Sequence, residues 1–237
     1  MNIEKQKLAD MLDEKKITKE DYQLLVHALD KQESKRSLVA LFINPFQKIA
    51  GQTALLAGLV IIVVMSYMGV VADVYYAGIF DCLNAANLKH TQAIKPNFSL
   101  LLTQNVINWL SLSATFILSA IIFKQKRFRV IDFLGTVAFS RFPTLILTTF
   151  IAIVWAANPS LLDFDVTKTT FQYHFNISGT LIDFMWQFCY AWQITIYLFA
   201  LKESSGLNGT KLWIAFVVSV FTADQFSHLL GTYLMWP

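Results

Sequence analysis

Charged residues are scarce in this sequence of 237 residues, of which 15% are Asp, Glu, Lys or Arg. A soluble domain carries about a quarter. Cysteines are few as well, and Cys82 and Cys189 lie in no CxxC pattern or cluster of metal ligands. A disulfide framework and a cysteine-based metal site are therefore not expected, and both residues are interpreted as unpaired thiols.

The sequence also lacks the short motifs of soluble catalysis. It has no Gly-rich nucleotide loop, no GxSxG and no HExxH. We therefore expect no catalytic residues, no cofactor and no metal. The first forty residues hold no short apolar core followed by a cleavage site, so we expect no signal peptide and an uncleaved first span.

What the sequence has is long apolar runs. Hydrophobic residues make up 55% of it, and the mean hydropathy is +0.49. A bilayer core of about 30 Å needs roughly 20 apolar residues in a helix. Because backbone groups in lipid must pair within the segment, helices are the expected form. The sequence predicts an all-α, polytopic membrane protein with five transmembrane helices, at about 49–71, 100–123, 133–156, 181–201 and 212–236.

Basic residues collect in the cytoplasmic loops of membrane proteins. Between the second and third spans stands "KQKRFR", with Lys124, Lys126, Arg127 and Arg129, and the next loop has Asp163 and Asp165 against a single lysine. The loops alternate in this way along the chain. We therefore expect a cytoplasmic N-terminus and an external C-terminus. The four basic residues form a predicted basic loop that contacts anionic lipid headgroups or a partner protein.

Residues 1–35 form a different kind of sequence, which predicts a small cytoplasmic helical hairpin ahead of the transmembrane domain at 36–237. Thr18 is expected to cap the second helix, with Asp21 completing a capping box. The pattern "KKIT" followed by "EDYQLL" resembles the SHOCT kind of short helical module, which implies oligomerisation or binding of a protein partner. The alternative is a solvated leader that only sets topology.

Several polar residues fall inside the predicted spans, where an ionisable group is costly and faces the bundle interior. Arg141 lies in the third span, and Asp224, Gln225 and His228 lie in the fifth. The depths of Arg141 and Asp224 differ by about one helical turn. A long arginine side chain covers that gap, so we expect an ion pair between them, with Gln225 and His228 on the same face.

This intramembrane polar cluster has three interpretations. It holds the helices together through hydrogen bonds, which is favoured, or it forms a proton or substrate site, or, least favoured, Asp224 and His228 belong to a metal site. Pro143, two residues after Arg141, predicts a kink. The kink is interpreted as a tolerated bend, with a shaped cavity as the alternative.

Three stretches carry a family resemblance: "LFINPFQKIAG", "FKQKRFRVIDFLGTVAFSRFPTLI" and "FALKESSGLNGTKLWIAFVVSV". Together they resemble the YIP family of five-span membrane proteins, named for Rab-type GTPase interaction in eukaryotes. The leader lacks the Asp-Leu-Tyr-Gly-Pro motif of eukaryotic members, so a prokaryotic relative in a bacterial inner membrane is favoured. The resemblance implies a membrane-organising role with no known reaction.

The sequence thus favours a non-enzymatic membrane scaffold or interaction protein, whose partners are the lipid bilayer and a protein, or a second copy bound through the hairpin. No nucleic acid is expected. The alternative is a small transporter or channel with a polar path lined by Arg141, Asp224 and His228. An intramembrane enzyme based on Asp224 and His228 comes third.

Overall fold

The computed structural model describes residues 11–12, 14, 16–26, 42–76, 78–80, 83–84, 95–125, 128–157 and 177–235. The chain divides into two compact units, Met1–Pro45 and Phe46–Pro237. Several predictions fall outside the described residues: the first ten residues of the hairpin, the boundary at residue 35, Cys82, and the Lys126 and Arg127 part of the basic loop.

The N-terminal unit contains a helix at residues 19–26 that begins with the predicted cap. The backbone N–H of Asp21 donates to Thr18 Oγ1 at 3.1 Å, and the backbone N–H of Thr18 donates to Asp21 Oδ2 at 3.3 Å. This reciprocal pair confirms the capping box.

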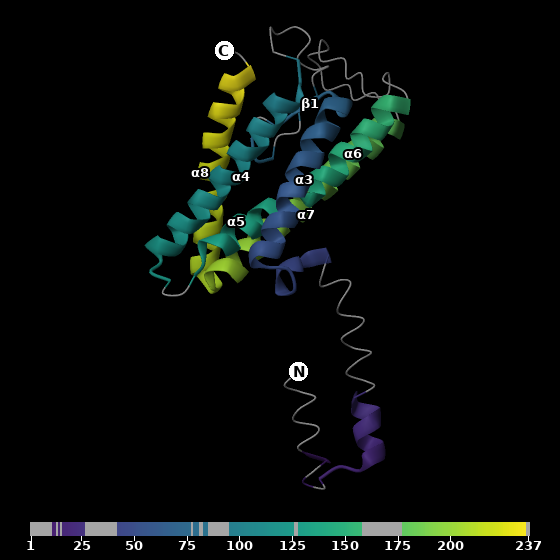
Figure 1. Cartoon of the computed structure of the whole chain (residues 1–237), viewed down its shortest axis with the longest axis vertical. Helices are drawn as coiled ribbons and strands as arrows, with labels where there is room; N and C mark the ends of the chain where they lie inside the picture. The colour runs from purple at the N-terminus through teal and green to yellow at the C-terminus, as the bar shows by residue number, and fades with distance from the viewer. Residues whose placement is uncertain are drawn as a thin grey trace. The chain divides into compact units, whose positions relative to one another are not determined.

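The second unit is mostly helical, and a short antiparallel strand pair follows its first helix (Figure 1). The elements are η1 (Pro45–Gln47), α3 (Gly51–Ala72), β1 (Val74–Tyr75), β2 (Leu83–Asn84), α4 (Phe98–Ile122), α5 (Val130–Phe139), α6 (Phe142–Ala157), α7 (Ile177–Ser205) and α8 (Gly209–Met235).

Four helical stretches in the described part of the chain are long and apolar enough to cross a membrane, as expected for an integral membrane protein. They coincide with the first, second, third and fifth predicted spans: Gly51–Ala72, Phe98–Ile122, Val130–Val154 and Gly209–Gly231. The fourth predicted span, 181–201, lies within α7, which has 29 residues but is not among the four. The five-span count therefore stays a prediction.

Helices α3 and α5 run parallel and approach closely at glycines. A methyl group added at Gly58 would lie 2.4 Å from Cβ of Ala138, and one added at Gly135 would lie 2.6 Å from the carbonyl oxygen of Gly51. Small residues let two backbones approach in this way, which is how membrane helices gain dispersion contacts without a hydrophobic drive.

Hydrogen bonds fix the direction of the other helices. In α4 and α8, Gln104 bonds to Gly231 near one end and Ser119 bonds to Ser219 near the other, so these helices are antiparallel. Helix α7 runs antiparallel to the α5–α6 stretch, because Thr136 bonds to Ser204 and Thr144 bonds to Gln193.

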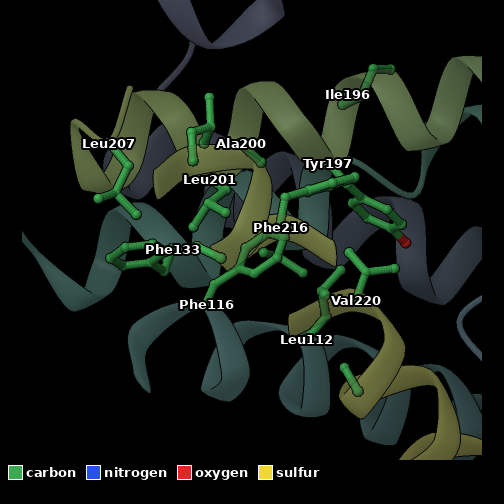
Figure 2. Packing of buried hydrophobic residues seen from close by; sticks show 14 of the residues in the cluster. Leu112, Phe116, Phe133, Ile196, Tyr197, Ala200, Leu201, Leu207, Phe216 and Val220 are labelled. Atoms are coloured by element: carbon green, nitrogen blue, oxygen red, sulfur yellow. The ribbon is translucent and has the colours of Figure 1, made fainter. Parts of the chain in front are cut away.

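An apolar cluster fills the space between α4, α5, α7 and α8. Figure 2 shows Phe116 of α4, Phe133 of α5 and Phe216 of α8 pointing toward one another, with Leu201 of α7 beside them. Tyr197 turns its hydroxyl away from this cluster (Figure 2). That hydroxyl belongs to the polar network described next.

Candidate functional site

The chain that follows α3 returns into the bundle. We call residues 74–80, all but residue 77 of which are described, the re-entrant segment. Asp73 has a φ of 54°, in the left-handed region, and it ends α3 by donating its backbone N–H to the carbonyls of Gly69 and Val70. The side chains of Val74 and Ile79 are buried beyond this turn.

Side-chain amides of α4 pair the backbone of this segment. The N–H of Tyr76 donates to Gln104 Oε1 at 3.0 Å. Asn108 Nδ2 donates to the carbonyl oxygens of Tyr76 and Gly78, both at 2.9 Å. Non-helical backbone at membrane depth is tolerated only where protein or water satisfies its polar groups. The two amides therefore allow the chain to lie between the helices.

Two tyrosines anchor the start of the segment. The buried hydroxyl of Tyr76 lies 3.1 Å from the carbonyl oxygen of Met65 and 3.0 Å from Thr148 Oγ1, which ties the segment to α3 and α6. The side chain of Tyr75 beside it is 2% exposed.

Arg141 lies between α5 and α6, eleven residues from Val130 and thirteen from Val154, near the middle of this span. It is 1% exposed. Its Nη1 donates to the carbonyl oxygen of Ile79 at 3.1 Å and to the Tyr197 hydroxyl at 3.4 Å, and its Nη2 donates to Asn105 Oδ1 at 2.9 Å. Neutral acceptors hold the cation in these three bonds.

Asp224 of α8 binds the backbone N–H of Ile79, the residue whose carbonyl oxygen accepts from Arg141. The backbone N–H of Ile79 donates to Asp224 Oδ1 at 3.0 Å. Among the residues that the structure describes, Arg141 and Asp224 form no ion pair, so the predicted direct pairing is wrong. The two charged side chains hold Ile79 by its carbonyl and its N–H, and the re-entrant segment lies between them.

The break between α5 and α6 follows from local chemistry. Pro143 has no N–H, so the carbonyl of Phe139 loses its usual helical donor. The N–H of Arg141 instead donates to Ala138 at 3.3 Å in a tighter turn, and regular bonding resumes from Leu145 to Arg141. The predicted kink is therefore an interruption of the helix, and Arg141 occupies it.

A chain of hydrogen bonds passes through Arg141 across the bundle. The Tyr197 hydroxyl accepts from Gln193 Nε2 at 2.6 Å, and Gln193 accepts from the Thr144 hydroxyl. On the other side of the guanidinium, Asn105 Nδ2 donates to Ser66 Oγ at 3.0 Å. Helices α3, α4, α6 and α7 are thereby connected through one buried cation.

Some buried polar atoms of this region have no hydrogen-bond partner within the described residues. They include Arg141 Nε, Asn108 Oδ1 and Ser227 Oγ. Gln104 is bonded to Gly231, and the two helices are antiparallel. Asn108, four residues later in α4, is therefore level with Ser227, four residues earlier in α8. A donor, an acceptor and a hydroxyl of this kind suit buried water, which needs two to four polar partners.

The predicted cluster of four is divided. Arg141 is buried and Asp224 is half-buried, whereas Gln225 and His228 are exposed on α8. Asp224 turns toward Ile79, and the part that Gln225 and His228 play on the same face stays a prediction.

The described ends of the basic loop, Lys124 and Arg129, are exposed. Arg129 makes an ion pair with Asp132 at 2.9 Å. No group of three or more His, Cys, Asp or Glu residues in the described ranges is placed to hold a metal ion.

Sequence reasoning missed the amides that organise the site. Gln104, Asn105 and Asn108 stand within "LLLTQNVINWL" of the second span, and all three are buried. Three amides within five residues of an apolar span are a readable signal, since each needs a partner inside the bundle. Comparison of the chain with known protein families, with curated proteins and with solved structures finds no match.

Proposed function

We propose that this protein is a non-enzymatic integral membrane protein of the YIP type, with five spans and a scaffold or interaction role. The five-span reading is supported by α7. Ser204 of α7 is hydrogen-bonded to Thr136, and Gln193 of α7 accepts from Thr144. Helix α7 therefore lies along the α5–α6 stretch and runs in the opposite direction. Helices α4 and α8 are antiparallel, which an additional crossing between α6 and α8 explains, and α7 supplies that crossing.

The proposed orientation places the N-terminus in the cytoplasm of a bacterial cell and the C-terminus outside the inner membrane. Basic residues lie at or near the helix ends on the side where α3, α5 and α8 begin and α4 and α7 end: Lys48, Lys124, Arg129, Lys202 and Lys211. This distribution supports the assignment, because Lys and Arg near span ends are retained on the cytoplasmic side. Anionic headgroups are the proposed lipid contact of this end.

The interaction role is carried by one observation, the exposed apolar side chains on the capped helix of the N-terminal unit. Leu24 is 71% exposed and Leu25 is 43% exposed in the helical stretch at residues 19–26. Helices in proteins gain most of their stability from packing an apolar face, and this packing is incomplete at these two positions. The proposed partner is a second protein or a second copy bound through this helix.

Photo-crosslinking in cells tests this role. A photoreactive amino acid is placed at Leu25 of the full-length protein and, as a matched control, at the exposed polar Gln23 of the same helix. We expect one recurrent partner to be captured from position 25 and not from position 23, and to capture this protein in the reciprocal experiment. Equal capture from both positions would contradict the proposal.

The second candidate, a transporter or channel, is favoured by the helix break at Arg141 and by the unpartnered buried atoms near it. Discontinuous spans line the binding sites of many transporters. Purified protein in liposomes with a chloride or proton gradient tests this candidate. A flux that falls in Ser227→Ala, while Ser113→Ala leaves it unchanged, would favour a path at the level of Asn108 and Ser227.

A further inference from the structure

Helix α8 stands at the side of the membrane unit, with α4 beside it (Figure 1). Between Val218 and Leu229, five of its exposed side chains fall within an arc of about 100° on the helix, at 3.6 residues per turn. We call this set the Gln225 face: Val218, Phe221, Thr222, Gln225 and Leu229. Three of its members are apolar and suit lipid, but the two at its centre are polar.

Neither Thr222 nor Gln225 makes a side-chain hydrogen bond with any part of the chain that the structure describes. Gln225 lies sixteen residues from Gly209 and ten from Met235, or about 24 and 15 Å from the two ends of the helix. The apolar span ends at Gly231, about 9 Å beyond Gln225, so the amide falls within the hydrocarbon of a bilayer whose core is about 30 Å thick. An unpaired amide in hydrocarbon is costly, so the Gln225 face needs a partner that donates and accepts hydrogen bonds.

We propose that the Gln225 face is the interface with a second copy of this chain. Two copies with the same topology in one membrane form a closed pair only about a two-fold axis along the membrane normal, which sets their α8 helices parallel. Each residue near the axis then meets itself. A carboxamide is self-complementary, because its NH₂ donates to the oxygen of its twin and its own oxygen accepts in return.

The surroundings of Gln225 agree with a symmetric partner. The Thr222 hydroxyl also donates and accepts, so it too can pair with its twin. The rest of the face, Val218, Phe221 and Leu229, carries no charge that would confront a like charge across the axis. Asp224 is turned toward Ile79 and stays out of the interface. The interface involves α8 alone and does not depend on the proposed role of the N-terminal unit.

Disulfide crosslinking in membranes locates the interface. In a Cys82→Ser, Cys189→Ala background, the full-length chain carries a cysteine at Val218 or, as the matched control, at Val217. These neighbouring valines are 58% and 60% exposed but point about 100° apart. We expect oxidation to give a disulfide-linked dimer at Val218→Cys and little at Val217→Cys. Equal yields, a higher yield at position 217, or linkage only to a different protein would overturn the proposal.

A second measurement tests the role of the amide. The fraction of dimer in liposomes is followed by energy transfer between labelled copies as lipid dilutes the protein. Gln225→Leu should weaken the dimer about tenfold or more, since two interhelical hydrogen bonds are lost, while Gln225→Asn retains part of the affinity. At lipid dilutions where the wild type is monomeric, both variants should unfold at the wild-type temperature, because the side chain is exposed in one copy. An unchanged dimer in Gln225→Leu would refute the assignment.

Discussion

The double variant Arg141→Leu, Asp224→Leu distinguishes two arrangements. In one, both side chains bind backbone groups of Ile79; in the other, they form a direct ion pair. In the structure the two charged side chains bind Ile79 from its carbonyl and its N–H and do not touch one another. Had they been an ion pair, removing one partner would strand a buried charge, and removing both would return the stability close to wild type. If both side chains bind Ile79 instead, Arg141→Leu leaves no unpaired charge on Asp224, so adding Asp224→Leu restores no stability.

The magnitudes follow from the bonds that each change removes. Arg141→Leu removes three hydrogen bonds, to Ile79, Tyr197 and Asn105. At about 0.6 to 2 kcal/mol for each interhelical bond, we expect a loss of about 2–6 kcal/mol. Asp224→Leu removes the bond from Ile79 and should cost about 1–2 kcal/mol. The double variant should be at least as destabilised as Arg141→Leu alone.

The assay is unfolding of the purified protein in mixed micelles by titration with a denaturing detergent, followed by tryptophan fluorescence. The control cycle pairs Arg141→Leu with Phe226→Leu, an exposed neighbour of Asp224, and should be additive within about 0.5 kcal/mol. A double variant of Arg141 and Asp224 that is as stable as wild type would refute the reasoning, because only a direct ion pair restores stability in that way.

Three further predictions test other parts of the fold. Gly58→Ala should destabilise the protein by about 1–3 kcal/mol in the same titration, since the new methyl group would lie 2.4 Å from Cβ of Ala138. Trp109→Phe should cost about 0.5–1.5 kcal/mol in thermal unfolding, because it removes the bond from Nε1 to the carbonyl of Leu134 at 2.9 Å. Thr18→Ala should cost the helix at residues 19–26 about 1 kcal/mol, seen as faster hydrogen exchange at these residues; unchanged exchange would contradict the cap.

The helical framework could be predicted from the sequence because it depends on local signals. Apolar runs of about 20 residues placed four spans correctly, and Thr18 with Asp21 placed a helix start. Pro143 predicted the interruption of the third span for an equally local reason, the missing N–H. Each of these signals requires no knowledge of which helix packs on which.

The re-entrant segment could not be predicted in the same way. The stretch "ADVYYAGIF" looks like part of a loop, since it is too short to span a bilayer and follows the end of an apolar run. Its burial depends on Gln104 and Asn108, which belong to a helix that begins more than twenty residues later. Long-range pairing of a backbone group with a side-chain amide leaves no periodic trace in the sequence.

The predicted pairing of Arg141 with Asp224 was wrong for the same reason. Depth along each helix brought both residues to the same region of the bundle, and that inference agrees with the structure, because both reach Ile79. What depth does not show is the backbone that lies between two side chains. A carbonyl and an N–H can satisfy a cation and a carboxylate without any contact between the charges.

The account rests on the contact between the Arg141 guanidinium and the peptide of Ile79 in the middle of the bundle. Solid-state NMR on the protein in lipid bilayers measures it directly, with ¹⁵N in the arginine side chains and ¹³C at the Ile79 carbonyl and the Asp224 carboxyl. We expect dipolar dephasing of the Ile79 carbonyl by Arg141, as its Nη1 at 3.1 Å from the carbonyl oxygen requires, and much weaker dephasing of the Asp224 carboxyl. Strong dephasing of the Asp224 carboxyl with none at Ile79 would contradict the account.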